Sequence, residues 1–152
     1  MSNADQDRIE KVVDLPVPVS RVWRALTDHE AFGEWFRVAL DGPFKVGTVT
    51  TGRMTFPGAE HVEWQSLTEK MDHETLFSFS WHPNALDSET NYEEGAKVIV
   101  EFRLQAIETG TRLNIVETGF LQFPDSKRLD ILRSNQQGWD IQATHIADYL
   151  DD

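Results

Sequence analysis

The chain of 152 residues contains no cysteine, which excludes a disulfide framework and any chemistry that uses a thiolate. Basic residues are scarce as well: 14 Lys and Arg stand against 26 Asp and Glu, a formal net charge of -12. Binding to phosphate backbones relies on Lys and Arg that replace counterions. The charge balance therefore disfavours nucleic acid as a partner, and it disfavours an anionic membrane face for the same reason.

Long apolar runs are also missing. The N-terminal residues MSNADQDR contain no apolar signal core, and no stretch reaches membrane-spanning length. No internal repeat and no tract rich in Pro, Gly or Ser divides the chain. We expect a single domain over residues 1–152, with residues 1–7 flexible, in the cytoplasm and without membrane insertion. The sequence leaves monomer and homodimer open.

The N-terminal part of the chain predicts one strand followed by two helices. Residues 8–15, RIEKVVDL, are rich in β-branched side chains, and Pro16 and Pro18 end the strand because proline cannot donate to a ladder. Pro18 suits the first turn of a helix, which apolar spacings of three and four extend to about Thr27. Asp28 is a candidate cap for a second short helix, HEAFGEWF.

The middle of the chain changes from helical to alternating periodicity. In LFSFSW, Phe77, Phe79 and Trp81 share one face of a strand, while the serines share the other. Short turns join such segments, which is typical of an antiparallel meander. The predicted strands lie at about 49–56, 61–71, 75–81, 97–107 and 111–120.

The last segment predicts one long helix over Asp125–Leu150, with Asp125 or Ser126 as candidate caps. Gly138 lies inside this helix, at a cost of about 1 kcal/mol relative to Ala, and either brings another backbone close or permits a bend. Residues at alternating spacings of three and four form one predicted buried face: Leu129, Leu132, Gln136, Trp139, Ala143, Ile146 and Leu150.

Together these elements predict an α+β helix-grip fold, in which a curved antiparallel sheet wraps around the long C-terminal helix and two short helices follow the first strand. An apolar pocket is expected where the sheet and the helix face each other, although each lining residue is also explained as ordinary core. The expected lining consists of Trp35, Met54, Phe56, Trp64, Phe77, Phe79, Trp81, Phe102, Ile115, Glu117, Leu132, Gln136 and Trp139.

Glu117 is the most informative polar residue, because strict alternation after Leu113 and Ile115 places its carboxylate inside the grip. A buried carboxylate without a partner has a raised pKa and is a candidate general acid or base. Two structural explanations remain open: a strand irregularity turns Glu117 outward, or Arg53 or Arg103 pairs with it.

Three further polar residues are weaker candidates for the site. His61 and Glu63 form an acid–base pair inside the pocket in one strand register, and lie in solvent in the other, where Trp64 points inward. Gln136 either hydrogen-bonds a ligand from the helix or satisfies a nearby polar group such as Glu117.

The five histidines predict no metal site, because they lack the paired spacing of metal-binding motifs and no cysteine assists them. No cofactor is expected, since no glycine-rich phosphate loop occurs. The acidic connection His82–Ala96 is long for a compact domain, and we expect either a gate at the mouth of the grip or a solvated insertion.

Several stretches carry a resemblance to a known family: PVPVSRVWRALTDHEAFGEWF, EHVEWQ, LFSFSWHP, TRLNIVETGF and the pair Gly138-Trp139. From about Arg8 to Leu150 the chain resembles the START-like helix-grip superfamily (SRPBCC), in the branch named after the activator of heat-shock protein 90 ATPase. The resemblance implies a fold that binds lipids, plant hormones, polyketides and other apolar molecules, and that in some members catalyses cyclisations or dehydrations.

The function expected from residues and resemblance together is binding of a small hydrophobic molecule. The first alternative is a cofactor-free acid–base enzyme that uses Glu117 or the pair of His61 and Glu63. The second is a chaperone-associated interaction protein. The eukaryotic co-chaperone of the branch engages its ATPase through an additional N-terminal domain, and the predicted first strand here begins at about residue 8, which counts against that alternative.

Overall fold

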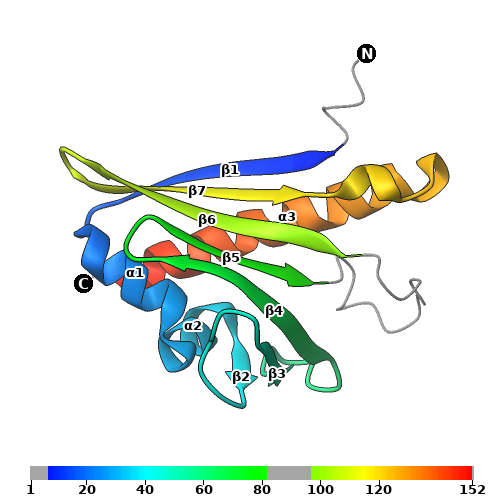
Figure 1. Cartoon of the computed structure of the whole chain (residues 1–152), viewed down its shortest axis with the longest axis horizontal. Helices are drawn as coiled ribbons and strands as arrows, with labels where there is room; N and C mark the ends of the chain where they lie inside the picture. Colours follow the sequence, from blue (N-terminus) through cyan, green and yellow to red (C-terminus); the bar gives the residue numbers. More distant parts are fainter. Residues whose placement is uncertain (1–6, 82–96, 152) are drawn as a thin grey trace.

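The protein was analysed as a computed structural model, which describes residues 7–81 and 97–151. Seven antiparallel strands form one sheet in the order β1-β7-β6-β5-β4-β3-β2, and the long helix α3 lies across one of its faces (Figure 1). This arrangement confirms the predicted helix-grip α+β fold. The elements are β1 (Arg8–Leu15), α1 (Val19–Thr27), α2 (His29–Phe36), β2 (Val38–Leu40), β3 (Val49–Met54), β4 (Glu63–Asp72), β5 (Leu76–Trp81), β6 (Val98–Ile107), β7 (Gly110–Thr118), the 3-10 helix η2 (Phe120–Gln122) and α3 (Asp125–Leu150).

The two short helices form where the sequence predicts them. Asp28 lies between α1 and α2, and its carboxylate accepts hydrogen bonds from the backbone N–H groups of Glu30 and Ala31 at 2.9 and 3.4 Å. It therefore satisfies two of the donors that every helix start leaves open. Arg37 ends α2 in the left-handed region with φ 70° and turns the chain into β2.

The inward face of the sheet follows the predicted alternation. Phe77 and Phe79 are fully buried, and Trp81 is nearly so. A bulge between Thr68 and Lys70 of β4 shifts the pairing with β5, and such an extra residue increases the local twist of a strand. The sheet can in this way curve around the helix.

Two short elements, β2 and η2, were missed by sequence reasoning. Three residues are too few to show a periodicity, and β2 exists because Val38 and Leu40 pair with Met54 and Gly52 of β3. This pairing is tertiary and leaves no local signal. Among the residues described, no helix is long and apolar enough to span a membrane.

The bounds of α3 agree with the prediction, but three details do not. The residue before the helix is Pro124, and no side chain caps the helix start, so the predicted caps Asp125 and Ser126 are wrong. Asp125 instead pairs with Arg128 at 2.9 Å. Leu129 and Gln136 are exposed rather than buried. At about 100° per residue, Leu129 lies roughly 80° around the helix from Trp139, so the regular spacing drifts off the buried face.

Candidate ligand site around Glu117

Glu117 lies near the end of β7, the second strand of the sheet, between β1 and β6. Its register neighbours are Ile9 on β1 and Val100 on β6, and Val100 is in turn paired with Phe79 on β5. All four side chains are buried, and Glu117 has no exposed surface. The strand thus places a carboxylate in an otherwise apolar row that faces α3, as the alternation predicts.

Three side chains donate hydrogen bonds to this carboxylate. The indole Nε1 of Trp81 donates to Oε2 at 2.6 Å, and that of Trp139 donates to Oε1 at 2.9 Å. The amide Nδ2 of Asn135 also donates to Oε1, at 3.0 Å. The carboxylate therefore connects β5 and β7 to α3 through bonds with neutral donors.

The arginines considered as partners of Glu117 are engaged elsewhere, so that explanation is wrong. Arg53 lies 3.7 Å from Glu63, and Arg103 lies 2.6 Å from Glu101. The alternative of an outward-facing Glu117 is excluded by its complete burial. The carboxylate lies inside the grip without a paired cation among its hydrogen-bond partners.

Burial raises the pKa of Glu117 above the usual glutamate value, because the charged form loses its hydration. The hydrogen bonds from Trp81, Trp139 and Asn135 act in the opposite direction, since they favour the carboxylate, but they do not cancel the effect of burial. The carboxyl group of Glu117 therefore keeps its proton to a higher pH than an ordinary glutamate does, as is common for groups at functional sites.

The two indoles that donate to the carboxylate contact each other and the ring of Phe36, so three aromatic rings from three different elements meet beside the site. The ring centroids of Phe36 and Trp81 are 6.3 Å apart, those of Phe36 and Trp139 are also 6.3 Å apart, and those of Trp81 and Trp139 are 5.9 Å apart. We refer to Phe36, Trp81 and Trp139 as the aromatic triangle. Trp64 and Phe102 extend it, at 5.2 Å from Trp81 and 5.8 Å from Trp139 respectively.

Two members of the expected pocket lining lie outside the grip. Phe56 is 46% exposed and lies beyond the end of β3, under the guanidinium of Arg37, so its assignment to the pocket is wrong. Gln136 is exposed on the side of α3 that faces β1. Eleven expected lining residues are buried inside: Trp35, Met54, Trp64, Phe77, Phe79, Trp81, Phe102, Ile115, Glu117, Leu132 and Trp139.

The chain matches a known protein family over most of its length. The model of the family described as "Activator of Hsp90 ATPase homolog 1-like protein" matches residues 16–151. The chain belongs to this family. No match was found among curated proteins.

Solved structures share the fold at low sequence identity. MLL2253 from Mesorhizobium loti is 20% identical with a TM-score of 0.74, over 95% of this chain and 96% of that one. A protein from Arthrobacter aurescens is 16% identical with a TM-score of 0.75, over 99% and 89%. DynU16 is 20% identical with a TM-score of 0.74, over 95% of this chain but only 47% of DynU16. The chain thus spans about half the length of DynU16, and these likenesses show the fold alone.

The two polar candidates at and just before the start of β4, Glu63 and His61, point away from the interior of the protein. His61 and Glu63 are exposed, whereas Val62 and Trp64 are buried. Of the two registers left open by the sequence, the structure has the one with Trp64 inward. His61 and Glu63 therefore do not form an acid–base pair inside the grip.

Asn135 is the site residue that sequence reasoning missed. It precedes Trp139 by four residues, so both side chains lie on the same side of α3. The spacing of four residues before Trp139 was the signal for Asn135, but the predicted apolar face of the helix included Gln136 instead. Residues 82–96, for which either a gate or a solvated insertion was expected, lie outside the described residues, and so does His82. Within 7–81 and 97–151, no three His, Asp or Glu residues are grouped as metal ligands.

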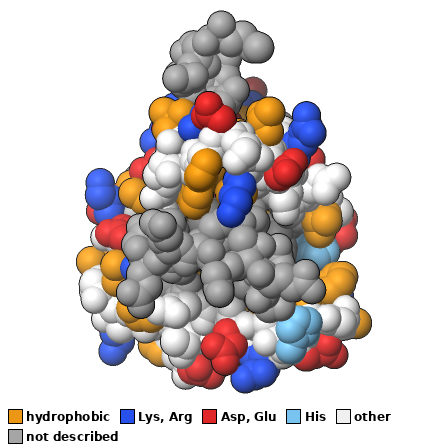
Figure 2. All heavy atoms as spheres, turned by 90° about the vertical axis from the view of Figure 1, so that its right-hand side faces the viewer, with side chains coloured by type: hydrophobic (Ala, Val, Ile, Leu, Met, Phe, Trp, Pro, Cys, Tyr) orange, Lys and Arg blue, Asp and Glu red, His pale blue; other side chains and the backbone are white. Residues whose placement is uncertain are grey.

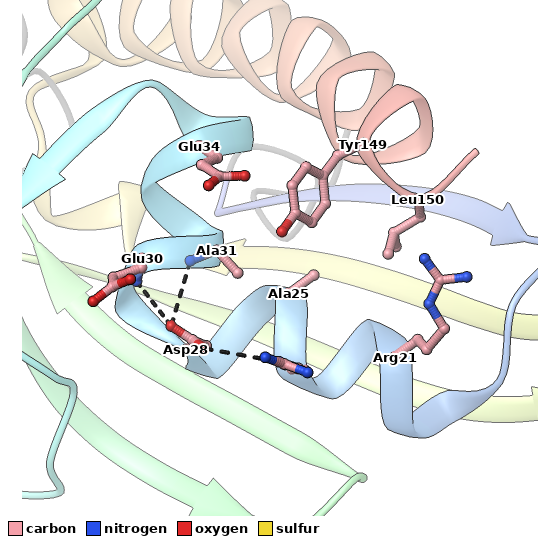
Figure 3. A pocket seen from close by; sticks show the side chains of 9 residues that line it. Arg21, Ala25, Asp28, Glu30, Ala31, Glu34, Tyr149 and Leu150 are labelled. Atoms are coloured by element: carbon pink, nitrogen blue, oxygen red, sulfur yellow. Dashed lines mark hydrogen bonds and ion pairs between the residues drawn. The ribbon is translucent and has the colours of Figure 1, made fainter. Parts of the chain in front are cut away.

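Two hollows lie elsewhere on the molecule. One, of about 290 Å³, lies between α1, α2 and the end of α3, where Tyr149 extends toward Glu34 and Asp28 (Figure 3). Asp28 there accepts its capping bonds and lies 3.9 Å from Arg24. The other, of about 350 Å³, lies between Arg8–Glu10 and the exposed flank of α3. Both are lined largely by charged and polar side chains and differ from the apolar site that the sequence predicts.

The surface at the end of the grip where β5 and β7 finish carries no dominant charge. On the described part of that face, acidic, basic and apolar side chains are interspersed (Figure 2). The excess of acidic residues in the chain is therefore not gathered there into one patch.

Proposed function

We propose that the protein binds a small, mainly apolar molecule between the sheet and α3, with Glu117 as the polar anchor of the site. The observation that carries this proposal is the fully buried carboxylate held by three neutral donors. The proposal concerns the interior of the grip rather than its surface.

A structural role alone does not account for Glu117. Moving a carboxylate out of water is costly, and a buried polar centre is commonly no more stable than well-packed apolar side chains of the same volume. The three donors would need no partner if the positions held apolar residues. A retained buried carboxylate with a raised pKa is the type of group that gathers at functional sites.

The surroundings of Glu117 have the composition of a ligand site. Such sites are lined mainly by apolar and aromatic side chains, with a few polar groups that orient the ligand. Here the aromatic triangle, Trp64 and Phe102 supply the apolar surface, and Glu117 with Asn135 supplies the polar groups. DynU16, which shares the fold, is described as a protein in the dynemicin biosynthetic locus, and this setting supports a role with small organic molecules.

Native mass spectrometry of the purified protein and thermal unfolding across a library of lipids and aromatic compounds test the proposal. We expect compounds that raise the melting temperature of the wild type and of Glu63→Gln, but not of Glu117→Gln. Glu63 is a matched control because its side chain is 78% exposed. If the library gives no hit and no bound molecule is found, or if Glu117→Gln binds as well as the wild type, the proposal is wrong.

Cofactor-free acid–base catalysis is the second candidate, and the raised pKa of Glu117 is the observation that favours it. In that case Glu117 would transfer a proton to or from a bound apolar substrate, as in a cyclisation or dehydration, without His61 or Glu63. Conversion of a bound compound by the wild type and by Glu63→Gln, but not by Glu117→Gln, would support it. Unchanged recovery of every bound compound would contradict it.

A further inference from the structure

We propose that the molecule bound at Glu117 is an organic cation: an amine or quaternary ammonium group on an apolar body. This inference rests on the proposed function and specifies the chemical class of the occupant. It follows from the combination of the buried carboxylate and the aromatic triangle at one place in the grip.

When ionised, Glu117 carries a negative charge without a cation among its hydrogen-bond partners. Its three hydrogen-bond partners are two indoles and an amide, and none of them is charged. In a poorly hydrated interior, a positive charge stabilises a carboxylate more than a neutral donor does, and a negative charge destabilises it. The site therefore favours cations over neutral molecules of the same shape, and disfavours anions most.

The rings beside Glu117 are of the types that attract cations. The faces of Trp, Tyr and Phe attract cations through the ring quadrupole, and Trp does so most strongly. The aromatic triangle places two tryptophans and one phenylalanine with their centroids about equally spaced, from 5.9 to 6.3 Å. Trp81 and Trp139 point their N–H edges at the carboxylate, so an ammonium group beside Glu117 meets a ring face once one of these indoles turns.

An ammonium group would reach Glu117 from the side of Asn135. In the structure the rings of the aromatic triangle contact one another, so an occupant requires one of them to move. The two indole hydrogen bonds of Glu117 are buried, whereas the bond from Asn135 is only partly buried. An ammonium N–H donor that replaces the amide of Asn135 at Oε1 would reach Glu117 from this more exposed side. A quaternary group has no N–H to donate and would be held there by its charge and by contact with the aromatic rings.

Calorimetric titration with a matched series of compounds tests the inference. Phenylpropylamine and its trimethylammonium derivative carry the cation, phenylpropanol is the neutral analogue, and phenylpropionate is the anion. We expect both cations to bind the wild type about tenfold more tightly than the alcohol, with phenylpropionate weakest, because cation–π and charge terms together contribute about 1.4 kcal/mol, which is tenfold in affinity. The advantage should vanish in Glu117→Gln.

The control variant is Glu63→Gln, which changes the net charge by the same amount on the surface. It should keep the preference for cations, which separates binding at Glu117 from general attraction to a chain of charge -12. A cation preference that persists in Glu117→Gln, or that disappears in Glu63→Gln, would overturn the inference.

The pH dependence gives a second readout that does not require a substitution to fold well. The trimethylammonium compound keeps its charge at every pH, so its affinity should rise as Glu117 ionises, while that of phenylpropanol should not.

Asn135→Ala supplies a further variant, because it removes the neutral donor that competes for Oε1 of Glu117. It should raise the affinity for the two cations severalfold, without a gain for the alcohol. Equal changes for cations and alcohol would contradict the assignment.

The outcomes distinguish the two proposals. If phenylpropanol binds the wild type as tightly as the amine and is lost in Glu117→Gln, the cation inference fails and the apolar ligand site stands. If library compounds bind but cations are absent among them, the result is the same. If nothing binds the wild type at all, both proposals fail.

Discussion

Glu117 and Arg128 are the two ionisable side chains that are buried among the described residues, and they are satisfied in opposite ways. Arg128 lies in the first turns of α3 and keeps a charged partner, Asp125, at 2.9 Å. It also donates to the carbonyl oxygens of Phe123 and Leu121 at 2.9 and 3.4 Å. Glu117 has no charged partner among its three hydrogen-bond donors and is more deeply buried.

The difference separates a structural charge from a candidate functional one. Arg128 ties the end of η2 to the start of α3, and its planar guanidinium reaches several acceptors at once. No such explanation applies to Glu117, because neutral donors lower the free energy of a buried carboxylate less than a cation would. The fold therefore contains one buried charge with a charged partner and one whose hydrogen-bond partners are all neutral, and the second is the basis of the proposed cation site.

The largest expected effect comes from removing a donor to Glu117. Trp139→Phe and Trp81→Phe keep an aromatic ring but lose the N–H, so each should lower the free energy of unfolding by about 1.5–3 kcal/mol at high pH, where Glu117 is ionised. The loss should be smaller at low pH, where it is protonated. Urea unfolding at several pH values measures both.

Trp35→Phe is the control for this pair, because the indole of Trp35 donates to a neutral acceptor, the carbonyl of Ala25, at 2.8 Å. It should cost about 0.5–1.5 kcal/mol at every pH. Equal costs for Trp35→Phe and Trp139→Phe, without a difference in pH dependence, would show that the charge of Glu117 does not matter to the fold.

The next largest effect is expected at Arg128, the buried charge that has a charged partner. Arg128→Met should lower the free energy of unfolding by about 1–2 kcal/mol, because two carbonyl groups lose a donor. The cost should stay constant between pH 5 and pH 8, since arginine remains charged in both states. A loss that varies with pH in this range as strongly as that of Trp139→Phe would remove the distinction between the two residues.

The third prediction concerns the pH dependence of stability itself. Burial raises the pKa of Glu117 in the folded state above its unfolded value. The unfolded chain therefore releases this proton at lower pH, and the contribution of Glu117 to stability is present below the ordinary glutamate pKa and lost as pH rises through the folded pKa. The stability of the wild type relative to Glu117→Gln should fall over that interval and then stay level. A rise over the same interval would contradict the direction of the shift.

The smallest expected effect is at Gly138, beside Trp139. A Cβ built there meets no atom within 4 Å, so the sequence-based option of a close backbone is wrong. Gly138→Ala should raise the free energy of unfolding by up to about 1 kcal/mol through helix propensity. A destabilised Gly138→Ala variant would indicate that the helix needs this freedom next to the aromatic triangle.

Local sequence patterns predict the direction of the side chains at the site, but not their hydrogen-bond partners. Alternation along β7 places Glu117 inside, and alternation along β5 places Trp81 on the same face. Neither pattern identifies their bond, because the two residues are 36 positions apart in the chain and meet only through the strands β5, β6 and β7. The alternatives involving Arg53 and Arg103 were equally compatible with the sequence.

For the helix α3, local patterns likewise predict the bounds of the element, but not every residue that it buries. Its bounds and most of its buried face follow from composition and spacing, but Leu129 and Gln136 turn out to be exposed and Arg128 buried. A strict spacing of three and four repeats every 3.5 residues, while an α-helix repeats every 3.6 residues. The predicted apolar face therefore rotates gradually around α3, and packing against the sheet determines which side of the helix is buried at each end.

By itself, the sequence determined the order of the elements, the curved sheet with its covering helix, and the inward direction of Glu117. These properties depend on periodicity and turn chemistry, which act between residues close together in the chain. Only the tertiary structure decided that Trp81, Asn135 and Trp139 hold this carboxylate, and that His61 and Glu63 do not join it. The choice of partner for a buried charge depends on distances between separate elements, and no local pattern encodes them.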